Sequence, residues 1–143
     1  MKKRCLSFLL FPFTAFSWLS LDPTSINLAD VRTGEWPIRL EKDIDDQGAT
    51  YSLIFRDQQL ETAVVMDTLV FQDLAKLRYF AQALEVLKKG HNGDIANFKN
   101  FTLKRADKRF DGVWYMLRIK YGLTDFQQPE ADIMCKTIDA LKQ

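Results

Sequence analysis

Short segments with the spacing of β-strands occupy much of the chain after residue 35, and they limit the fold more than any other feature. Residues 36–42 and 49–56 alternate apolar and polar side chains, which predicts two strands with one buried face each. Turn-forming residues separate them, so they predict a hairpin. Pro37 suits an edge strand or a strand start. Residues 62–71 are dense in Val, Thr, Leu and Phe and predict a third strand of a meander.

A helix is predicted directly after these strands. Asp73 suits its first turn, Lys88 and Lys89 suit its last turn, and Gly90 follows where a helix commonly ends. Apolar residues recur at helical spacing between these signals: Leu74, Leu77, Ala81, Leu84 and Leu87. Start, stop and spacing all agree, so this is the best-defined element.

The last third of the chain follows a similar order. Residues 98–105 and 113–121 predict a fourth and a fifth strand, with a turn at 107–112 between them. Pro129 and Glu130 suit the start of a closing helix. The apolar side of this helix holds Ile133, Met134, Ile138 and Leu141.

Together these elements predict an α+β fold. We expect a single antiparallel sheet of about five strands, in the order βββα-ββα, with two helices packed on one face. A length of 143 residues suits one domain with one core. That domain is predicted to span residues 36–143, after a linker at 22–35 and an N-terminal hydrophobic segment at 1–21.

Similar spacings recur in the two parts of the chain. Tyr51-Ser52-Leu53 and Met66 recur 50 residues later as Phe101-Thr102-Leu103 and Met116, and Phe80, Leu84 and Leu87 recur 54 residues later as Met134, Ile138 and Leu141. Either a hairpin-and-helix unit is duplicated, or any two amphipathic units share such spacings. A duplication would imply a pseudo-twofold arrangement.

The N-terminal segment has the layout of a signal peptide. Basic residues 2–4 precede an apolar run at 5–21, Asp22 closes the run, and a cleavage site could follow Ser17. Three interpretations stay open: a cleaved signal, an uncleaved membrane anchor through residues 5–21, or a segment packed in the fold. A cleaved signal predicts export to the periplasm or the exterior. The others predict a membrane-anchored or a cytoplasmic protein.

Few residues could carry out catalysis. The chain has one histidine, His91, and two cysteines, and it lacks the HExxH, CxxC, GxSxG, GxxxxGK and GxGxxG motifs. Cys135 falls within the closing helix, where a buried and unreactive thiol is the ordinary interpretation. Asp43, Asp45 and Asp46 suit an acidic turn better than a calcium loop. We therefore predict no enzyme, no catalytic residue, no metal site and no cofactor.

Charge divides the chain into two parts. Residues 40–73 hold eight acidic and two basic residues, whereas residues 74–122 hold eleven basic and four acidic ones. Basic and aromatic residues interleave along the fourth and fifth predicted strands, and such a surface can bind phosphates while bases stack on its rings. The candidate binding set for an anionic partner is Lys99, Phe101, Lys104, Arg105, Lys108, Arg109, Trp114, Arg118 and Lys120.

A simpler interpretation competes with the binding set. Phe101, Leu103, Tyr115 and Leu117 would alternate inward as core, which leaves Lys104 and Arg118 on a solvated outer face that keeps the sheet soluble.

Two likenesses at the level of element order bear on function. With the hydrophobic leader as a first helix, the order is similar to that of small dimeric secretion chaperones. As two hairpin-helix units, it resembles the single-strand-binding folds of the Pur-alpha or Whirly type. Neither likeness rests on a residue motif, so no functional residue is carried over.

The leading hypothesis is a non-enzymatic exported binding or assembly module that engages a protein partner, or a second copy, through its sheet face or edge. The alternative is a cytosolic single-stranded nucleic-acid-binding protein that uses the basic and aromatic face. Other anionic ligands, such as glycans or lipid headgroups, fit the same patch, and contact with a membrane is expected only through residues 5–21.

Overall fold

The structure is a computed structural model that describes residues 24–142, so the hydrophobic segment 1–21 lies outside the described residues. Two helices and eight strands follow in the order β1 (Thr24–Arg32), β2 (Ile38–Asp45), β3 (Gly48–Arg56), β4 (Met66–Phe71), α1 (Leu74–Lys88), β5 (Ile95–Asn97), β6 (Phe101–Lys108), β7 (Gly112–Ile119), β8 (Gly122–Gln127) and α2 (Gln128–Asp139). In this part of the chain, neither helix has the length and apolar character needed to cross a membrane.

The α+β class predicted from the sequence is confirmed, but a single sheet of five strands is wrong. The strands form two four-stranded antiparallel sheets, sheet A with the order β1-β2-β3-β4 and sheet B with the order β5-β6-β7-β8. The expected linker at 22–35 contributes β1, and β5 and β8 complete sheet B. The element order is therefore ββββα twice.

Local sequence explains where the helices begin. Asp73 caps α1, because its carboxylate accepts a hydrogen bond from the backbone N–H of Lys76 at 2.9 Å. Glu130 accepts one from the backbone N–H of Gln127 at 2.8 Å, which forms half of a capping box at the start of α2. Each sheet also turns its central hairpin at a glycine with positive φ, Gly48 at 126° and Gly112 at 80°.

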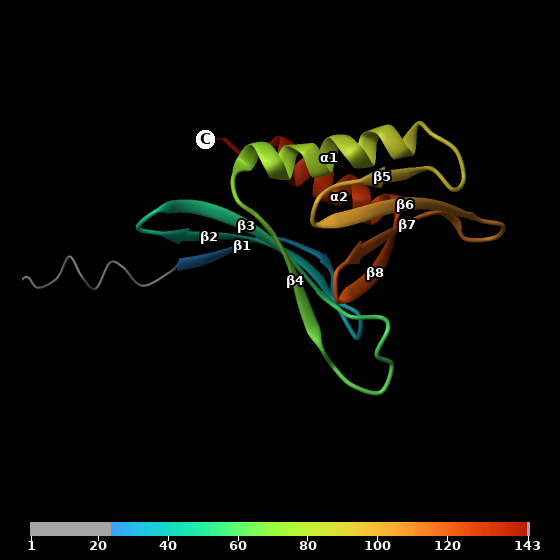
Figure 1. Cartoon of the computed structure of the whole chain (residues 1–143), viewed down its shortest axis with the longest axis horizontal. Coiled ribbons are helices and arrows are strands. Elements are labelled where there is room, and N and C mark those ends of the chain that lie inside the picture. The colour runs from blue at the N-terminus through green and yellow to red at the C-terminus, as the bar shows by residue number, and fades with distance from the viewer. Residues whose placement is uncertain (1–23, 143) are drawn as a thin grey trace, which may run out of the picture.

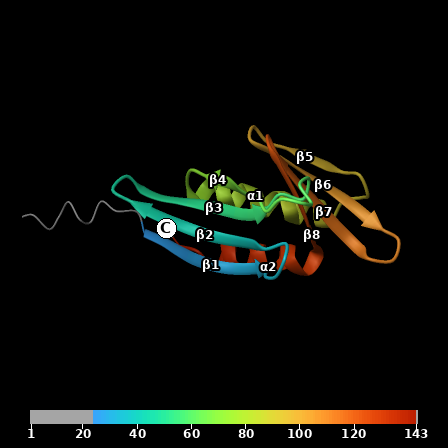
Figure 2. The same cartoon turned by 90° about the horizontal axis from the view of Figure 1, so that it is seen from below.

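Both helices lie on one side of the molecule, with the two sheets below them (Figure 1). Seen from below, β1 to β3 extend toward one end of the molecule and β5 to β7 toward the other (Figure 2). The helices pack against each other, α1 also contacts β3 to β6, and α2 also contacts β1, β7 and β8. Each helix therefore bridges both sheets.

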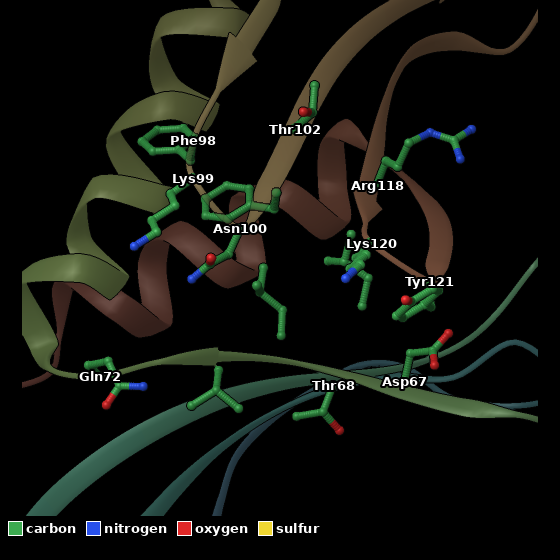
Figure 3. Close-up of a pocket in the computed structure, with 14 residues that line it drawn as sticks. Asp67, Thr68, Gln72, Phe98, Lys99, Asn100, Thr102, Arg118, Lys120 and Tyr121 are labelled. Atoms are coloured by element: carbon green, nitrogen blue, oxygen red, sulfur yellow. The ribbon is translucent and has the colours of Figure 1, made fainter.

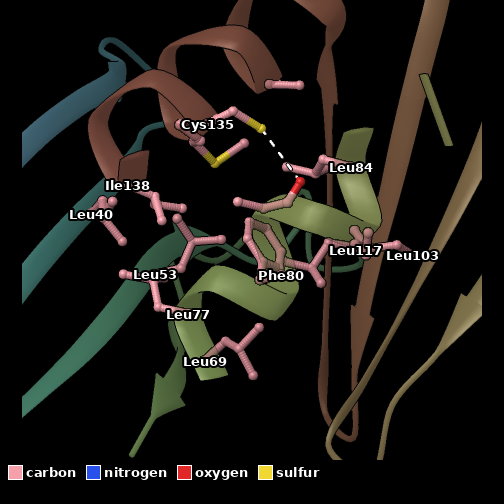
Figure 4. Packing of buried hydrophobic residues seen from close by; sticks show 14 of the residues in the cluster. Leu40, Leu53, Leu69, Leu77, Phe80, Leu84, Leu103, Leu117, Cys135 and Ile138 are labelled. Atoms are coloured by element: carbon pink, nitrogen blue, oxygen red, sulfur yellow. Dashed lines mark hydrogen bonds between the residues drawn. The ribbon is translucent and has the colours of Figure 1, made fainter. Parts of the chain in front are cut away.

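One hydrophobic core joins the two ββββα units, β1 to α1 and β5 to α2. It includes Leu53 of sheet A, Leu117 of sheet B and Phe80 and Met134 of the helices, all 1% exposed or less. Figure 4 shows Leu53, Leu77 and Phe80 packed below the helix that carries Cys135. Since every element contributes to a single core, the two units form one folded body.

Of the two recurrent spacings in the sequence, only one relates equivalent elements of the fold. The offset of 54 relates α1 to α2, since Phe80 and Leu84 are buried like Met134 and Ile138. The offset of 50 does not hold, because it compares β3, the third strand of its sheet, with β6, the second strand of the other.

The third strands correspond at an offset of 64. Tyr51 and Leu53 of β3 correspond to Tyr115 and Leu117 of β7, and both tyrosines pair with a phenylalanine on the next strand. Gly48 and Gly112, the hairpin glycines, match at the same offset.

The two sheets are joined by a seam between the segment after β3 and the start of β8. The backbone N–H of Gln58 donates to the carbonyl oxygen of Leu123 at 2.8 Å, and the N–H of Leu123 donates to the Asp57 carboxylate at 3.2 Å. The Gln58 amide also donates to Asp125 at 2.9 Å. These bonds fix β8 of one sheet against the end of β3 in the other.

Asp67 and Gly122 meet at this seam. They hold the same place in their sheets. Asp67 pairs with Phe55 of β3, Gly122 pairs with Ile119 of β7, and Ile119 is the residue that corresponds to Phe55 at the offset of 64. A Cβ added to Gly122 would contact the Asp67 carboxylate and would lie 3.2 Å from the Asp67 Cβ. The missing side chain of Gly122 therefore makes room for Asp67.

Candidate functional site

Strand alternation sorts the nine predicted binding residues by face. Leu103, Tyr115 and Leu117 point into the core, so their neighbours along β6 and β7 point away from the helices. We call this side the outer face of sheet B and define it by Thr102, Lys104, Ala106, Lys108, Trp114, Met116, Arg118, Leu123, Asp125 and Gln127, together with Ile95 and Asn97 of β5. Four of the nine predicted residues lie on it: Lys104, Lys108, Trp114 and Arg118.

Lys104 and Arg118 are the two exposed cations in the middle of the outer face. Lys104 lies opposite Met116, and Arg118 lies opposite Thr102 on the neighbouring strand. No ion pair with a described residue engages either side chain, in contrast to Lys108. Both cations are therefore available to an anionic ligand.

Lys108 and Trp114 form a cation–aromatic pair at the end of the face near the β6–β7 turn. The Lys108 Nζ lies 4.0 Å from the centroid of the Trp114 ring and 3.9 Å from a carboxylate oxygen of Asp125. The indole N–H of Trp114 has no hydrogen-bond partner among the described residues. Asp125 is the one carboxylate on the outer face, and it is shared with Gln58 of the seam.

The turns of sheet B carry two more pairs of the same kind. The guanidinium carbon of Arg109 lies 5.2 Å from the centroid of Phe110, and the Lys120 Nζ lies 5.1 Å from the centroid of Tyr121. The rings are unusually open to solvent, with Phe110 88% and Tyr121 76% exposed. Exposed rings beside cations can stack on flat ligands that also carry negative charge.

A groove of about 850 Å³ runs between β4 of sheet A and one end of sheet B. Sheet B contributes the β5–β6 turn with Lys99, the β7–β8 turn with Lys120 and Tyr121, and Arg118 at the edge of the outer face (Figure 3). Strand β4 contributes the opposite wall, which includes Asp67. Lys99, Phe101, Arg118 and Lys120, which are four of the nine predicted residues, therefore meet in one groove.

Phe101 belongs to the core as much as to the groove. Its ring centroid lies 6.0 Å from that of Phe71, 5.7 Å from Phe80 and 4.5 Å from Phe98. This cluster joins both sheets and α1, so Phe101 fixes the groove wall rather than offering a free ring.

Arg105 lies on the inner side of β6, away from the outer face. Its Nη1 donates to the carbonyl oxygens of Leu87, Lys88 and Gly90 at 2.8–2.9 Å, and its Nε donates to Asp107 at 2.7 Å. The guanidinium therefore caps the C-terminal end of α1, where unpaired carbonyls and the helix dipole favour a cation. This geometry gives Arg105 a structural role, and we leave it out of the site.

Two carboxyl groups meet where the groove reaches the seam. Burial raises the pKa of Asp67, and the negative charge of the neighbouring Asp57 raises it further. One oxygen of Asp67 is fully buried without a partner among the described residues, whereas Asp57 accepts hydrogen bonds from the backbone N–H groups of Gln59 and Leu123. Among the described residues that line the groove, Asp67 is the one acid, and it is therefore less readily charged than an ordinary aspartate.

The other chemically active side chains lie apart from the groove. Burial, and to a lesser extent Glu85, raises the pKa of the Cys135 thiol to about 12, and its Sγ faces the carbonyl of Ala81 (Figure 4). His91 lies in the exposed loop after α1, where its backbone N–H donates to Asp94. Within residues 24–142, no three His, Cys, Asp or Glu side chains are grouped to hold a metal ion.

Two exposed residues of the site were not in the predicted binding set. Phe110 and Tyr121 each follow a cation directly in the sequence, Arg109 and Lys120, and each falls in a turn of sheet B. A basic residue followed directly by an aromatic one was the signal that could have found them, although only Phe110 falls in the predicted turn, since Tyr121 was predicted to end the fifth strand. Neither a protein-family model nor a curated protein sequence matches this chain.

Proposed function

We propose that this chain is a non-enzymatic protein that binds single-stranded nucleic acid along the outer face of sheet B and in the adjoining groove. Lys and Arg side chains would contact the phosphates, and the exposed rings would stack on the bases. The element order ββββα, present twice, supports the likeness to single-strand-binding folds of the Pur-alpha or Whirly type, although fold alone assigns no function.

One observation carries this proposal. Three cation–aromatic pairs, Lys108 with Trp114, Arg109 with Phe110 and Lys120 with Tyr121, all lie on the outer face of sheet B or in its turns. Between the turns that hold Phe110 and Tyr121, the outer face also carries the exposed cations Lys104 and Arg118, and Arg118 lines the groove together with Lys120 and Tyr121. A repeated combination of a positive charge with a flat ring matches a polymer that repeats a phosphate with a base.

The lining of the groove and the exposed rings favour a single strand over a duplex. The groove is bounded on one side by β4 and on the other by two turns, and its lining is mixed polar and apolar. The rings on sheet B can stack only on bases that are unpaired and turned outward. We therefore expect duplex DNA to bind through its phosphates alone and more weakly.

Fluorescence anisotropy with a labelled single strand of about 16 nucleotides tests the proposal. We expect binding at low salt, and we expect log K to fall against log [salt] with a slope of about −3, from four to five phosphate contacts. A duplex of the same length should bind at least about tenfold more weakly. Absence of single-strand binding at low salt would refute the proposal.

A second candidate follows from the charges of sheet A. The side of sheet A that faces away from the helices carries Asp30, Glu41 and Asp43 against Arg39. Such a surface on a second copy could dock on the basic face of sheet B, which agrees with the assembly module that the sequence suggested first. Sedimentation at low and high salt distinguishes the two, since this candidate requires a salt-sensitive oligomer without nucleic acid.

The compartment of the protein follows from its N-terminus. Nucleic-acid binding goes with the cytosolic alternative, whereas a docking module goes with export. The mass of the purified chain decides between them, because loss of residues 1–17 or 1–21 would establish a cleaved signal.

A further inference from the structure

A second cavity opens from the groove toward α1. It has a volume of about 300 Å³, and it lies between the end of β4, the first turns of α1 and the β5–β6 turn. Both cavities share the stretch from Phe98 to Phe101 as a wall. A volume of this size is at the lower end of the range for ligand pockets, which suits a small flat group better than a chain segment.

Aromatic rings line this cavity on two sides. Phe98 stacks on Phe101 with ring centroids 4.5 Å apart and an interplanar angle of 15°, yet Phe98 remains 38% exposed. Phe101 is itself held by Phe71 and Phe80, so the exposed ring rests on a fixed support. Tyr79 of α1, 57% exposed, also lines the cavity. These rings provide a prepared surface for stacking.

The polar groups of the cavity complement a nucleobase. Gln72 and Asn100 line it from opposite sides, and no hydrogen bond between described residues uses either amide. A side-chain amide offers both donors and an acceptor, as the edge of an unpaired base does. Lys76 and Lys99 also line the cavity, where they can reach the phosphates that flank such a base.

The groove connects this cavity to the outer face of sheet B. Thr102 and Arg118 are neighbours across β6 and β7 on the outer face, and both also line the groove. The groove then continues past Asn100 to Phe98. A strand bound on the outer face can therefore follow the groove and reach the cavity without leaving the basic surface.

We propose that this cavity takes one unstacked base of the bound single strand, which stacks on Phe98 and hydrogen-bonds to the amides of Gln72 and Asn100. The inference rests on the proposed function and deepens it. The outer face supplies binding that is independent of sequence, and the cavity supplies a preference for particular bases.

Binding to single strands with bases and to an abasic strand of the same length tests the role of the stacking platform. We expect Phe98→Ala to weaken binding of the base-containing strand by about tenfold and to leave binding of the abasic strand unchanged. Tyr79→Ala, at an exposed helix position, should show the same selectivity with a smaller effect. Val86→Ala, an exposed α1 position outside the cavity, is the matched control and should change neither affinity.

Four labelled homo-oligomers, one for each base, test the amides. The natural chain should distinguish its best from its worst homo-oligomer by at least about fivefold, and Gln72→Ala/Asn100→Ala should reduce that range to about twofold. Both positions are exposed and outside the core, so the variant is expected to melt like the natural chain.

The outcomes separate the inference from the proposed function. If neither the base-containing nor the abasic strand binds, the proposed function fails and the inference fails with it. If both bind but Phe98→Ala weakens both equally, or the amide variant keeps the full range of base preference, the inference alone is refuted. Selective loss in both experiments supports both proposals.

Discussion

Sheets A and B are built alike on the inside and differently on the outside. Tyr51 and Leu53 of sheet A and Tyr115 and Leu117 of sheet B occupy equivalent buried positions against the helices. The outer positions differ in charge, with carboxylates prevailing on sheet A and Lys or Arg on sheet B.

Exposure to solvent also separates a cation–aromatic pair of sheet A from the pairs in the turns of sheet B. In sheet A, Arg56 lies 4.0 Å from the Trp36 ring, but it is 7% exposed and donates to the carbonyl oxygen of Glu35 at 3.0 Å. In sheet B, Phe110 and Tyr121 are open to solvent beside their cations. One set holds the fold together, and the other is available to a partner.

The inner pattern of side chains sets the fold, whereas the outer pattern sets what each sheet can bind. Inner positions must fill a shared core, so both sheets keep the same residue types there. Outer positions face solvent, where a change of charge costs little stability. Function is therefore best sought where the two sheets differ.

The largest expected effect is a loss of stability when a buried leucine is truncated at the equivalent inner position of either sheet. Leu53→Ala and Leu117→Ala should each lower the free energy of unfolding by about 2–5 kcal/mol, because each removes a fully buried side chain. Since both residues belong to one core, each variant should still unfold in one transition. Chemical denaturation followed by circular dichroism and by tryptophan fluorescence measures both quantities. Two separate transitions would contradict a shared core.

A slightly smaller effect is expected from exchanging the outer charges. Lys104→Glu/Arg118→Glu on sheet B should weaken single-strand binding at low salt by about 100-fold, because it replaces two phosphate contacts by repulsion. Asp30→Lys on sheet A combined with Asp46→Lys in its β2–β3 turn changes the charge by the same amount with opposite sign, and it should not weaken binding. Fluorescence anisotropy measures both.

Net charge alone has to be excluded as the cause. Lys89→Glu/Lys136→Glu places the same change on exposed positions of the helix side, and it should lower affinity by less than about threefold. An equal loss in this control would show that total charge, rather than the outer face of sheet B, determines binding.

The ends of the two helices provide the next test. Arg105 donates to three carbonyls at the C-terminal end of α1, whereas Arg78 donates to one, that of Leu141, just after α2. Arg105→Ala should therefore lower stability by about 2 kcal/mol and Arg78→Ala by about 1 kcal/mol. Thermal melts of both variants measure the difference. Equal losses would indicate that the number of capped carbonyls is not what matters.

The contact between equivalent positions at the seam should give a still smaller effect. Gly122→Ala is expected to lower stability by about 1–2 kcal/mol, because its Cβ would press on the Asp67 side chain. Adding Asp67→Ala to that variant should recover most of the loss, whereas adding Asp111→Ala in an exposed turn should not. Denaturant titration of the three variants measures these differences in the free energy of unfolding.

The smallest expected effect is a pH dependence that originates from the same seam. Because the pKa of Asp67 is raised above the ordinary value of 3.8, the folded chain keeps a proton that the unfolded chain releases. Its contribution to stability is therefore fully present below pH 3.8 and is lost as the pH rises through the raised pKa. Asp67→Asn should remove this decline.

Melting temperatures from pH 3 to pH 7 measure the decline. The natural chain and Asp67→Asn should differ in slope just above pH 3.8, with Asp111→Asn as the matched exposed control. Parallel curves for all three proteins would contradict a role for Asp67.

The sequence predicted the central hairpins and both helices because their periodicity is regular. It did not predict β1, because register shifts after Asn27 and after Asp30 interrupt the alternation of Thr24–Arg32. It did not predict β8 because Gly122, Asp125 and Gln127 look like turn residues in a strand of six. With those strands unseen, the remaining ones could be counted into one sheet.

Part of the candidate site was predictable because side chains alternate between the two faces of a regular strand. Lys104 and Arg118 were placed on an outer face by alternation, and the structure shows them there. Arg105 adjoins Lys104 on one strand and so had to face the other side, which the binding set overlooked. The groove itself could not be predicted, because it forms between β4 and turns of the other sheet.

The fit of Asp67 against Gly122 makes the two halves of this protein non-interchangeable. A homodimer of the first half would bring two aspartates to the point where the sheets meet, and a homodimer of the second half would leave that point empty. At this contact each half therefore complements the other half better than it would complement a copy of itself. Their covalent linkage guarantees that unlike halves assemble, so one sheet can specialise while the other keeps the pair intact.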